Sequence, residues 1–201
     1  MTDWPSAALV RQSCEMTTLS RRPVIICDVD GTLCDVRSVR HFVERPVGAM
    51  KFRANFARFH AASEACPGFP RVIELVSALT LHGFAIVVVT AREARWAALT
   101  ERWLDRHDVR RVELITRSDF DYRPDAVVKA EICAEIQSRY DPRLAVDDRE
   151  DILAVWASAS IPTVRVDEAG CLSAVTWPGA TQDDELNAIV EYARASALPC
   201  P

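Results

Sequence analysis

The sequence predicts an α/β fold with a doubly wound, mainly parallel sheet. Two observations carry this prediction: short apolar runs rich in β-branched residues alternate with longer runs at helical spacing, and turn residues separate them. Strands that alternate with helices favour a parallel sheet covered on both faces, with right-handed crossovers. At 201 residues, the chain is long enough for one core with a small insert.

The expected strands are short and buried on both faces. Residues 23–28 (PVIICD) form an apolar run that ends at an Asp-Gly turn, and residues 84–90 (FAIVVVT) form a second run after His82-Gly83. Continuous apolar runs of this length are typical of strands inside a parallel sheet. Shorter runs predict the remaining strands at 112–116, 144–147 and 163–166.

The segments between the strands repeat apolar residues every three or four positions, which predicts amphipathic helices. The helix expected at 124–140 begins with Pro124, a residue that the first helical turn tolerates. The other helices are expected at 70–81, 92–107, 149–159 and 183–195.

One segment, residues 36–67, interrupts this alternation. Phe52, Phe56 and Phe59 recur in it at spacings of four and three, which indicates a small helical cap insert with an aromatic packing face. Because the insert follows the first strand directly, it can also cover a site there as a lid. The predicted organisation is a flexible N-terminal extension (1–22), a core (23–182) that contains the cap insert, and a C-terminal helix and tail (183–201).

The composition is that of a globular, soluble chain, 49% hydrophobic and 26% charged. No apolar run approaches the roughly 20 residues that span a bilayer. The first 22 residues lack an apolar signal core and the seven cysteines form no CxxC pair, so we expect a cytoplasmic location.

The charge is unevenly distributed along the chain. The net charge of −5 argues against a general nucleic-acid-coating protein. Residues 36–60 nevertheless carry six basic residues and one acid. This basic segment is either a solvated helix face or a contact surface for an anionic substrate.

Carboxylates follow two of the expected strands. Asp28 ends the first strand, and Asp147 with Asp148 ends the strand at 144–147. Ligands bind at the carboxyl ends of the strands in an open parallel sheet. Because side chains alternate along an extended chain, Asp28 and Asp30 can face the same cleft. The sequence therefore predicts a polar site at this edge.

Clustered carboxylates repel each other, and a cation relieves the repulsion. Mg²⁺ suits such a site because it prefers oxygen ligands and binds one or two carboxylates together with substrate phosphate. We expect Asp28 and Asp147 to be direct ligands and Asp30 to contribute a backbone carbonyl.

A phosphate monoester is the substrate class that this arrangement favours. Asp28 can attack phosphorus to give an aspartyl-phosphate, and Asp30 can protonate the leaving oxygen and then activate water. Thr90 ends the second strand and can hold phosphoryl oxygens. Lys129 is one of only two lysines against 22 arginines, which indicates a position where a compact ammonium is needed.

The run DVDGT at 28–32, followed by Thr90, Lys129 and the pair at 147–148, resembles the motif set of the haloacid dehalogenase (HAD) superfamily. The resemblance covers most of the chain and implies a HAD-type phosphatase, a phosphoric monoester hydrolase that uses Mg²⁺. It implies catalytic roles for Asp28 and Asp30, phosphate contacts from Thr32, Thr90 and Lys129, and metal contacts from Asp28, Asp30, Asp147 and Asp148.

Three segments, TAREARW (90–96), RPDAVVKAEI (123–132) and LAVDDREDILAVW (144–156), are similar to the 3′-phosphatase domains of bacteriophage polynucleotide kinase/phosphatases. This similarity implies removal of 3′-phosphates from nucleic-acid ends, as in nucleic-acid repair, with Arg92, Arg117 and Asp125 near the substrate. No GxxxxGK[ST] phosphate loop occurs in the sequence, so we expect no kinase domain in this chain.

Two other functions are compatible with these motifs. A phosphatase of free nucleotides or other small phosphate esters would use the same core, and the acidic balance of the chain suits it. A non-catalytic module that binds phosphate or a partner protein is disfavoured by the intact pair of Asp28 and Asp30. The expected partner is therefore a phosphate ester, and no membrane contact is expected.

Overall fold

The computed structural model describes residues 21–196 and confirms the predicted fold class. Its sheet is parallel throughout, in the order β3-β2-β1-β4-β5, so the first strand lies at the centre. The strands are β1 (Pro23–Cys27), β2 (Ala85–Glu93), β3 (Glu113–Arg117), β4 (Asp141–Asp147) and β5 (Thr163–Arg165). The chain leaves β1 toward β2 on one side and reaches β4 on the other, which creates a crevice at the carboxyl end of β1.

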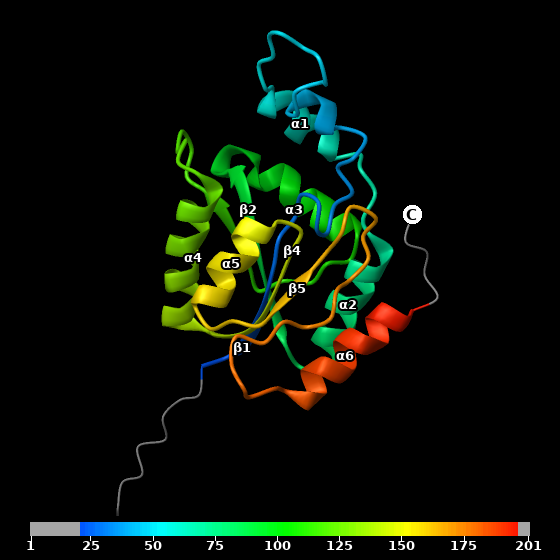
Figure 1. The fold of residues 1–201 in the computed structure, drawn as a ribbon, viewed down its shortest axis with the longest axis vertical. Coiled ribbons are helices and arrows are strands. Elements are labelled where there is room, and N and C mark those ends of the chain that lie inside the picture. Colours follow the sequence, from blue (N-terminus) through cyan, green and yellow to red (C-terminus); the bar gives the residue numbers. More distant parts are fainter. Residues whose placement is uncertain (1–20, 197–201) are drawn as a thin grey trace, which may run out of the picture.

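Helices cover both faces of this sheet (Figure 1). They are α1 (Phe56–Ser63), α2 (Pro70–Leu81), α3 (Ala97–Arg106), α4 (Asp125–Arg139), α5 (Glu150–Ser158) and α6 (Asp184–Ala195), with short 3₁₀ turns at η1 (Arg40–Phe42) and η2 (Ala94–Trp96). Within residues 21–196, no helix has the length and apolar character needed to cross a membrane.

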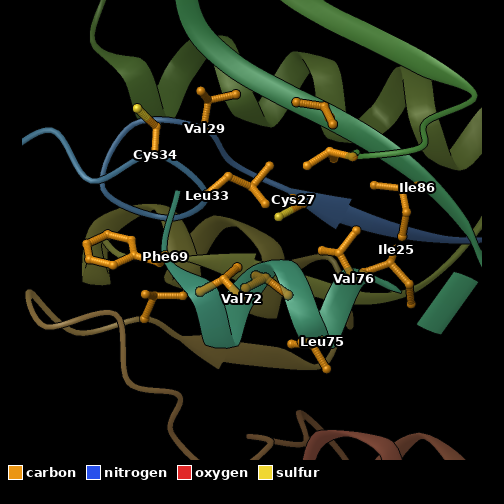
Figure 2. Close-up of a cluster of buried hydrophobic side chains, with 14 of the residues drawn as sticks. Ile25, Cys27, Val29, Leu33, Cys34, Phe69, Val72, Leu75, Val76 and Ile86 are labelled. Atoms are coloured by element: carbon orange, nitrogen blue, oxygen red, sulfur yellow. The ribbon is translucent and has the colours of Figure 1, made fainter. Parts of the chain in front are cut away.

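Successive side chains of β1 point to opposite faces of the sheet and so contribute to two separate core layers. Ile25 and Cys27 pack with apolar residues of α2, α3 and α6. Figure 2 shows this layer, with Val76 of α2 beside Ile25. Val24 and Ile26 point the other way and pack against α4 and α5. Because β1 is covered on both faces, both sets of its alternating side chains are apolar, which explains the continuous apolar run in the sequence.

The second strand is longer than predicted, and the expected helix over 92–107 begins later. Strand β2 continues to Glu93, which pairs with Arg117 of β3 after a register shift beyond Thr90. The chain then makes the turn η2 before α3 starts. The helical spacing of apolar residues did not reveal that pairing with β3 extends the strand past Thr90.

The cap insert is less helical than predicted. Only η1 and α1 form helices in it, and α1 lies above the carboxyl end of the sheet (Figure 1). Phe59 is buried, whereas Phe52 is 37% and Phe56 is 57% exposed. The prediction of one aromatic packing face is therefore wrong for Phe52 and Phe56. The predicted N-terminal extension lies outside the described residues, except for positions 21 and 22, and so does the end of the C-terminal tail.

Candidate active site

A lysine joins two of the predicted carboxylates at the carboxyl end of the sheet. Lys129, in the second turn of α4, donates to Asp28 Oδ1 at 2.7 Å and to Asp147 Oδ2 at 2.8 Å. All three residues are at least 94% buried. The backbone N–H of Asp28 donates to Val146 O at 3.1 Å, so the sheet ladder continues to the site. The ammonium thus neutralises carboxylates from neighbouring strands.

Asp28, Asp147 and Asp148 form a candidate metal centre. One oxygen of each lies within 4.8 Å of the others. A set of carboxylate oxygens at this spacing fits a hard divalent cation such as Mg²⁺. The cluster does not include the Asp30 carboxylate, so Asp30 could contribute only its backbone carbonyl. Thr32 is fully buried and donates to Asp148 Oδ1 at 3.4 Å, which directs its hydroxyl to the carboxylate cluster.

Burial and mutual repulsion govern the protonation of these groups. Burial raises the pKa of Asp28, and Lys129 only partly offsets this effect. Burial and the neighbouring Asp147 raise the pKa of Asp148 to about 6. Burial acts to lower the pKa of Lys129, but Asp28 and Asp147 outweigh it and hold the pKa above its usual value. A charged ammonium therefore lies among acids whose own charges are costly.

Asp30, two residues after Asp28, is held by Arg92 of β2. Arg92 donates from Nε to Asp30 Oδ2 at 2.8 Å and from Nη2 to Asp30 Oδ1 at 2.5 Å. The same guanidinium donates to Ser63 Oγ at 2.9 Å and to Thr100 Oγ1 at 3.1 Å. The Arg92 side chain is fully buried, whereas that of Asp30 is 22% exposed. This bidentate pair fixes the carboxylate of Asp30 at the rim of the cavity.

A second ion-pair group is centred on Asp125, the first residue of α4. Asp125 accepts from Arg117 of β3 through Oδ1 and from Arg149 Nη1 through Oδ2 at 2.5 Å. Arg117 also donates from Nη1 to the backbone oxygens of Asp121 and Arg123, at 3.1 and 3.2 Å. Asp125 therefore orients two guanidinium groups beside the site rather than offering a free carboxylate.

These groups surround one cavity of about 540 Å³. Its polar side contains Asp28, Asp30, Thr90, Arg92, Lys129 and Asp148, and further charges come from Arg40, Glu44, Glu93, Arg95, Arg117, Asp121, Asp125 and Arg149. Its apolar side is formed by Val36, Val43, Phe56, Phe59 and Tyr122. A volume of this size suits a small organic ligand or the end of a larger one.

The structure brings most of the predicted site residues together. Nine of the ten line the cavity or belong to the acidic cluster, and Thr32 touches that cluster. Thr90 is buried, and its Oγ1 accepts from the Arg92 backbone N–H at 3.2 Å. Arg92 was expected at the substrate, yet its guanidinium is directed to Asp30.

Sequence reasoning assigned no role to several residues that shape the site. Arg149 directly follows the Asp147-Asp148 pair, and this position was a signal that could have identified it. Ser63 and Thr100 bind Arg92 from distant parts of the chain, and no motif in the sequence marks them.

Comparisons with known proteins identify the family of this chain and relatives of its fold. The model of the family "Polynucleotide kinase PNKP phosphatase domain" matches residues 22–170. Among solved structures, the Pnkp1/Rnl/Hen1 complex contains a chain that is 24% identical, with a TM-score of 0.61 over 74% of this chain and 47% of that one. This chain thus spans about half the length of that relative.

Two further structures share the fold at low identity. The Mycobacterium tuberculosis protein tyrosine kinase A, PtkA, is 22% identical with a TM-score of 0.54, over 86% of this chain and 99% of that one. The haloacid dehalogenase-like hydrolase SP0104 from Streptococcus pneumoniae is 16% identical with a TM-score of 0.53, over 71% of this chain and 83% of that one. The family match covers most of the chain, so this protein is a HAD-type phosphatase that belongs to the family of the polynucleotide kinase PNKP phosphatase domain.

Proposed function

We propose that this protein is a Mg²⁺-dependent phosphomonoesterase that removes 3′-phosphates from nucleic-acid ends through an aspartyl-phosphate. The observation that carries the chemistry is the pair of differently held carboxylates: Asp28 is buried on Lys129, and Asp30 is fixed at the cavity by Arg92. Two carboxylates in different environments suit two different roles.

In the first step, a carboxylate oxygen of Asp28 attacks phosphorus and the bond between phosphorus and the leaving oxygen breaks. Asp30, in its protonated form, gives its proton to that oxygen. In the second step, Asp30 takes a proton from water, and the water oxygen attacks phosphorus and releases Asp28 and inorganic phosphate. Lys129 and Thr90 line the cavity and would hold phosphoryl oxygens as negative charge redistributes.

Asp28, Asp147 and Asp148 would hold Mg²⁺, with Asp30 contributing its backbone carbonyl. The bound cation would neutralise charge on the phosphate and so allow an anionic nucleophile to approach it. Lys129 would share the same task, because its ammonium contacts both Asp28 and Asp147.

The nucleic-acid substrate is supported by the family and by arginine side chains at the cavity. Arg95, Arg117 and Arg149 line the cavity and can contact further phosphates of a polynucleotide. The basic segment at 36–60 lies in the cap insert, and its Arg40 lines the cavity. We also propose that 36–67 acts as the cap of a core spanning 23–182, so that the cap contributes to substrate choice.

A free nucleotide is the second candidate substrate. The cavity of about 540 Å³ lies within the range of small-molecule sites, roughly 300–1,000 Å³, and needs no extended groove to hold one nucleotide. This alternative uses the same catalytic residues as the polynucleotide 3′-phosphatase. The two substrates differ only in whether a polynucleotide chain continues beyond the terminal nucleoside.

A substrate panel with and without Mg²⁺ tests the proposal. It contains a 3′-phosphorylated oligonucleotide, the matching 5′-phosphorylated oligonucleotide, 3′- and 5′-mononucleotides, and an aryl phosphate. We expect the highest kcat/KM for the 3′-phosphorylated oligonucleotide, loss of activity on chelation, and loss of turnover in Asp28→Asn. A clear preference for mononucleotides would favour the alternative, and turnover by Asp28→Asn would refute the nucleophile.

A further inference from the structure

The cavity has an aromatic wall that the proposed chemistry does not use. Helix α1 contributes Phe56, Phe59 and His60 to it, and the loop between β3 and α4 contributes Tyr122. Phe56 is 57% and Tyr122 is 82% exposed. Large exposed aromatic rings at the rim of a charged cavity indicate contact with a ligand that is itself flat and apolar.

His60 lies deeper in the same wall, packed among other rings. Its ring centroid is 5.2 Å from that of Phe59, 5.6 Å from that of Trp96 and 6.2 Å from that of Phe56. His60 is only 6% exposed, and burial lowers its pKa to about 4, so the imidazole is neutral at physiological pH. A neutral imidazole has one nitrogen that donates and one that accepts.

Two buried polar atoms without a partner belong to residues that line the cavity. In the described part of the chain, four buried side-chain atoms have no hydrogen-bond partner. His60 Nδ1 and Arg117 Nε belong to residues that line the cavity, and Trp96 Nε1 belongs to the ring packed against His60. Buried polar groups are normally satisfied, so His60 Nδ1 and Arg117 Nε point to a ligand in the cavity that supplies the missing partners.

The position of His60 relative to the acid indicates which part of a substrate it meets. His60 and the acid are joined through Arg92, whose guanidinium donates to Asp30 and to Ser63 Oγ, while Ser63 Oγ donates to the His60 backbone oxygen. In the proposed mechanism, Asp30 protonates the leaving oxygen, so the leaving group lies on this side of the cavity. For a nucleotide that carries a 3′-phosphate, the leaving group is the sugar, and the base extends beyond it toward the rim.

We propose that α1 binds the nucleoside that carries the scissile phosphate: its base stacks on Phe56, and its sugar forms a hydrogen bond with His60. This inference rests on the proposed function and adds a residue-level account of substrate choice. Stacking on an aromatic side chain tolerates any base, so the wall would select nucleosides without reading sequence.

The test compares two 3′-phosphorylated oligonucleotides that differ only at the terminal residue, which either carries a base or is abasic. Binding of each is measured by fluorescence anisotropy with full-length Asp28→Asn protein and Mg²⁺, so that turnover is not required. We expect the base-bearing end to bind more tightly, by roughly 5- to 150-fold, the range for one stacked base.

Two further substitutions in the Asp28→Asn protein separate base stacking on Phe56 from the sugar contact of His60. Phe56→Ala should remove the preference for the base and leave binding of the abasic end unchanged, and Phe56→Tyr should restore the preference. His60→Phe should weaken binding of both ends by about 3- to 10-fold, the effect of one hydrogen bond. Phe52→Ala is the matched control, because Phe52 belongs to the same cap segment but does not line the cavity.

The outcomes distinguish this inference from the proposed function. Equal binding of the two ends, or an equal loss on both ends in Phe56→Ala, would overturn the stacking contact. Unchanged binding in His60→Phe would overturn the sugar contact. Absence of 3′-phosphate hydrolysis by the wild-type protein, together with base-dependent binding through Phe56, would instead refute the proposed activity and leave the nucleoside site standing.

Discussion

Arg92 is the residue whose replacement tests the geometry of the acid most directly. Its buried guanidinium makes four hydrogen bonds, two to Asp30 and one each to Ser63 and Thr100. Removing one partner of a buried ion pair typically destabilises a protein by about 3–5 kcal/mol. Because the Asp30 side chain is 22% exposed, water can solvate it in part, and we expect Arg92→Met to lower the free energy of unfolding by about 3 kcal/mol in urea titrations.

The effect on catalysis is measured with Arg92→Lys, which keeps the charge but loses the bidentate geometry. A misplaced general acid reduces kcat by about 10²- to 10⁴-fold and leaves KM nearly unchanged, because Asp30 acts in the transition state. We expect the loss to be large for an alkyl phosphate and much smaller for p-nitrophenyl phosphate, whose leaving group needs little protonation.

The opposite result would show that Arg92 binds substrate, the role that the sequence resemblance implied for it. In that case Arg92→Lys would raise KM and reduce the turnover of both esters equally. Arg95→Lys is the matched control, because Arg95 also lines the cavity but its side chain is 47% exposed and pairs with Glu93. Equal losses on the two esters would refute the positioning role.

Three other substitutions have expected outcomes. In Lys129→Met, two buried carboxylates lose their counter-charge, so without metal the free energy of unfolding should fall by about 3–5 kcal/mol. Added Mg²⁺ should then raise the melting temperature of this variant more than that of the wild type. Between pH 6.5 and 5, the wild type should lose about 1.5 kcal/mol of stability that His60→Phe retains. The folded pKa of His60 is about 4, so the unfolded chain binds more protons in this range and stability falls as the pH falls. Asp125→Asn should raise KM about tenfold with little change in kcat, because Arg117 and Arg149 lose the carboxylate that orients them; an unchanged KM would contradict that role.

The candidate site at the edge of the sheet could be predicted because its residues occupy the ends of regular elements. Asp28 follows β1, Asp147 ends β4, and Lys129 is in the second turn of α4. In a parallel sheet the carboxyl ends of all strands lie at the same edge. The positions of these three residues along the chain were therefore enough to predict that their side chains lie close together. The contacts of Lys129 with both carboxylates follow from that topology.

The cap insert and the partners of Arg92 could not be predicted in the same way. Ser63 is 29 residues from Arg92 in sequence and reaches it only because α1 folds back over the sheet. No periodic pattern specifies how an insert folds back, which is also why the exposure of Phe56 was missed. Strand β2 likewise extends to Glu93 through a pairing with Arg117 that depends on the register of β3.

These unpredicted contacts connect the cap to the proposed acid. Arg92 donates to Ser63 Oγ at 2.9 Å, and Ser63 in turn donates to the backbone oxygen of His60 at 2.8 Å. The last turn of α1 is thereby joined to the guanidinium that holds Asp30. If α1 binds the terminal nucleoside, the helix that recognises the leaving group also helps to place the carboxyl group that protonates it. A substrate without the nucleoside would then bind more weakly, and Asp30 would be positioned less well for proton transfer. The nucleoside would therefore affect kcat as well as KM.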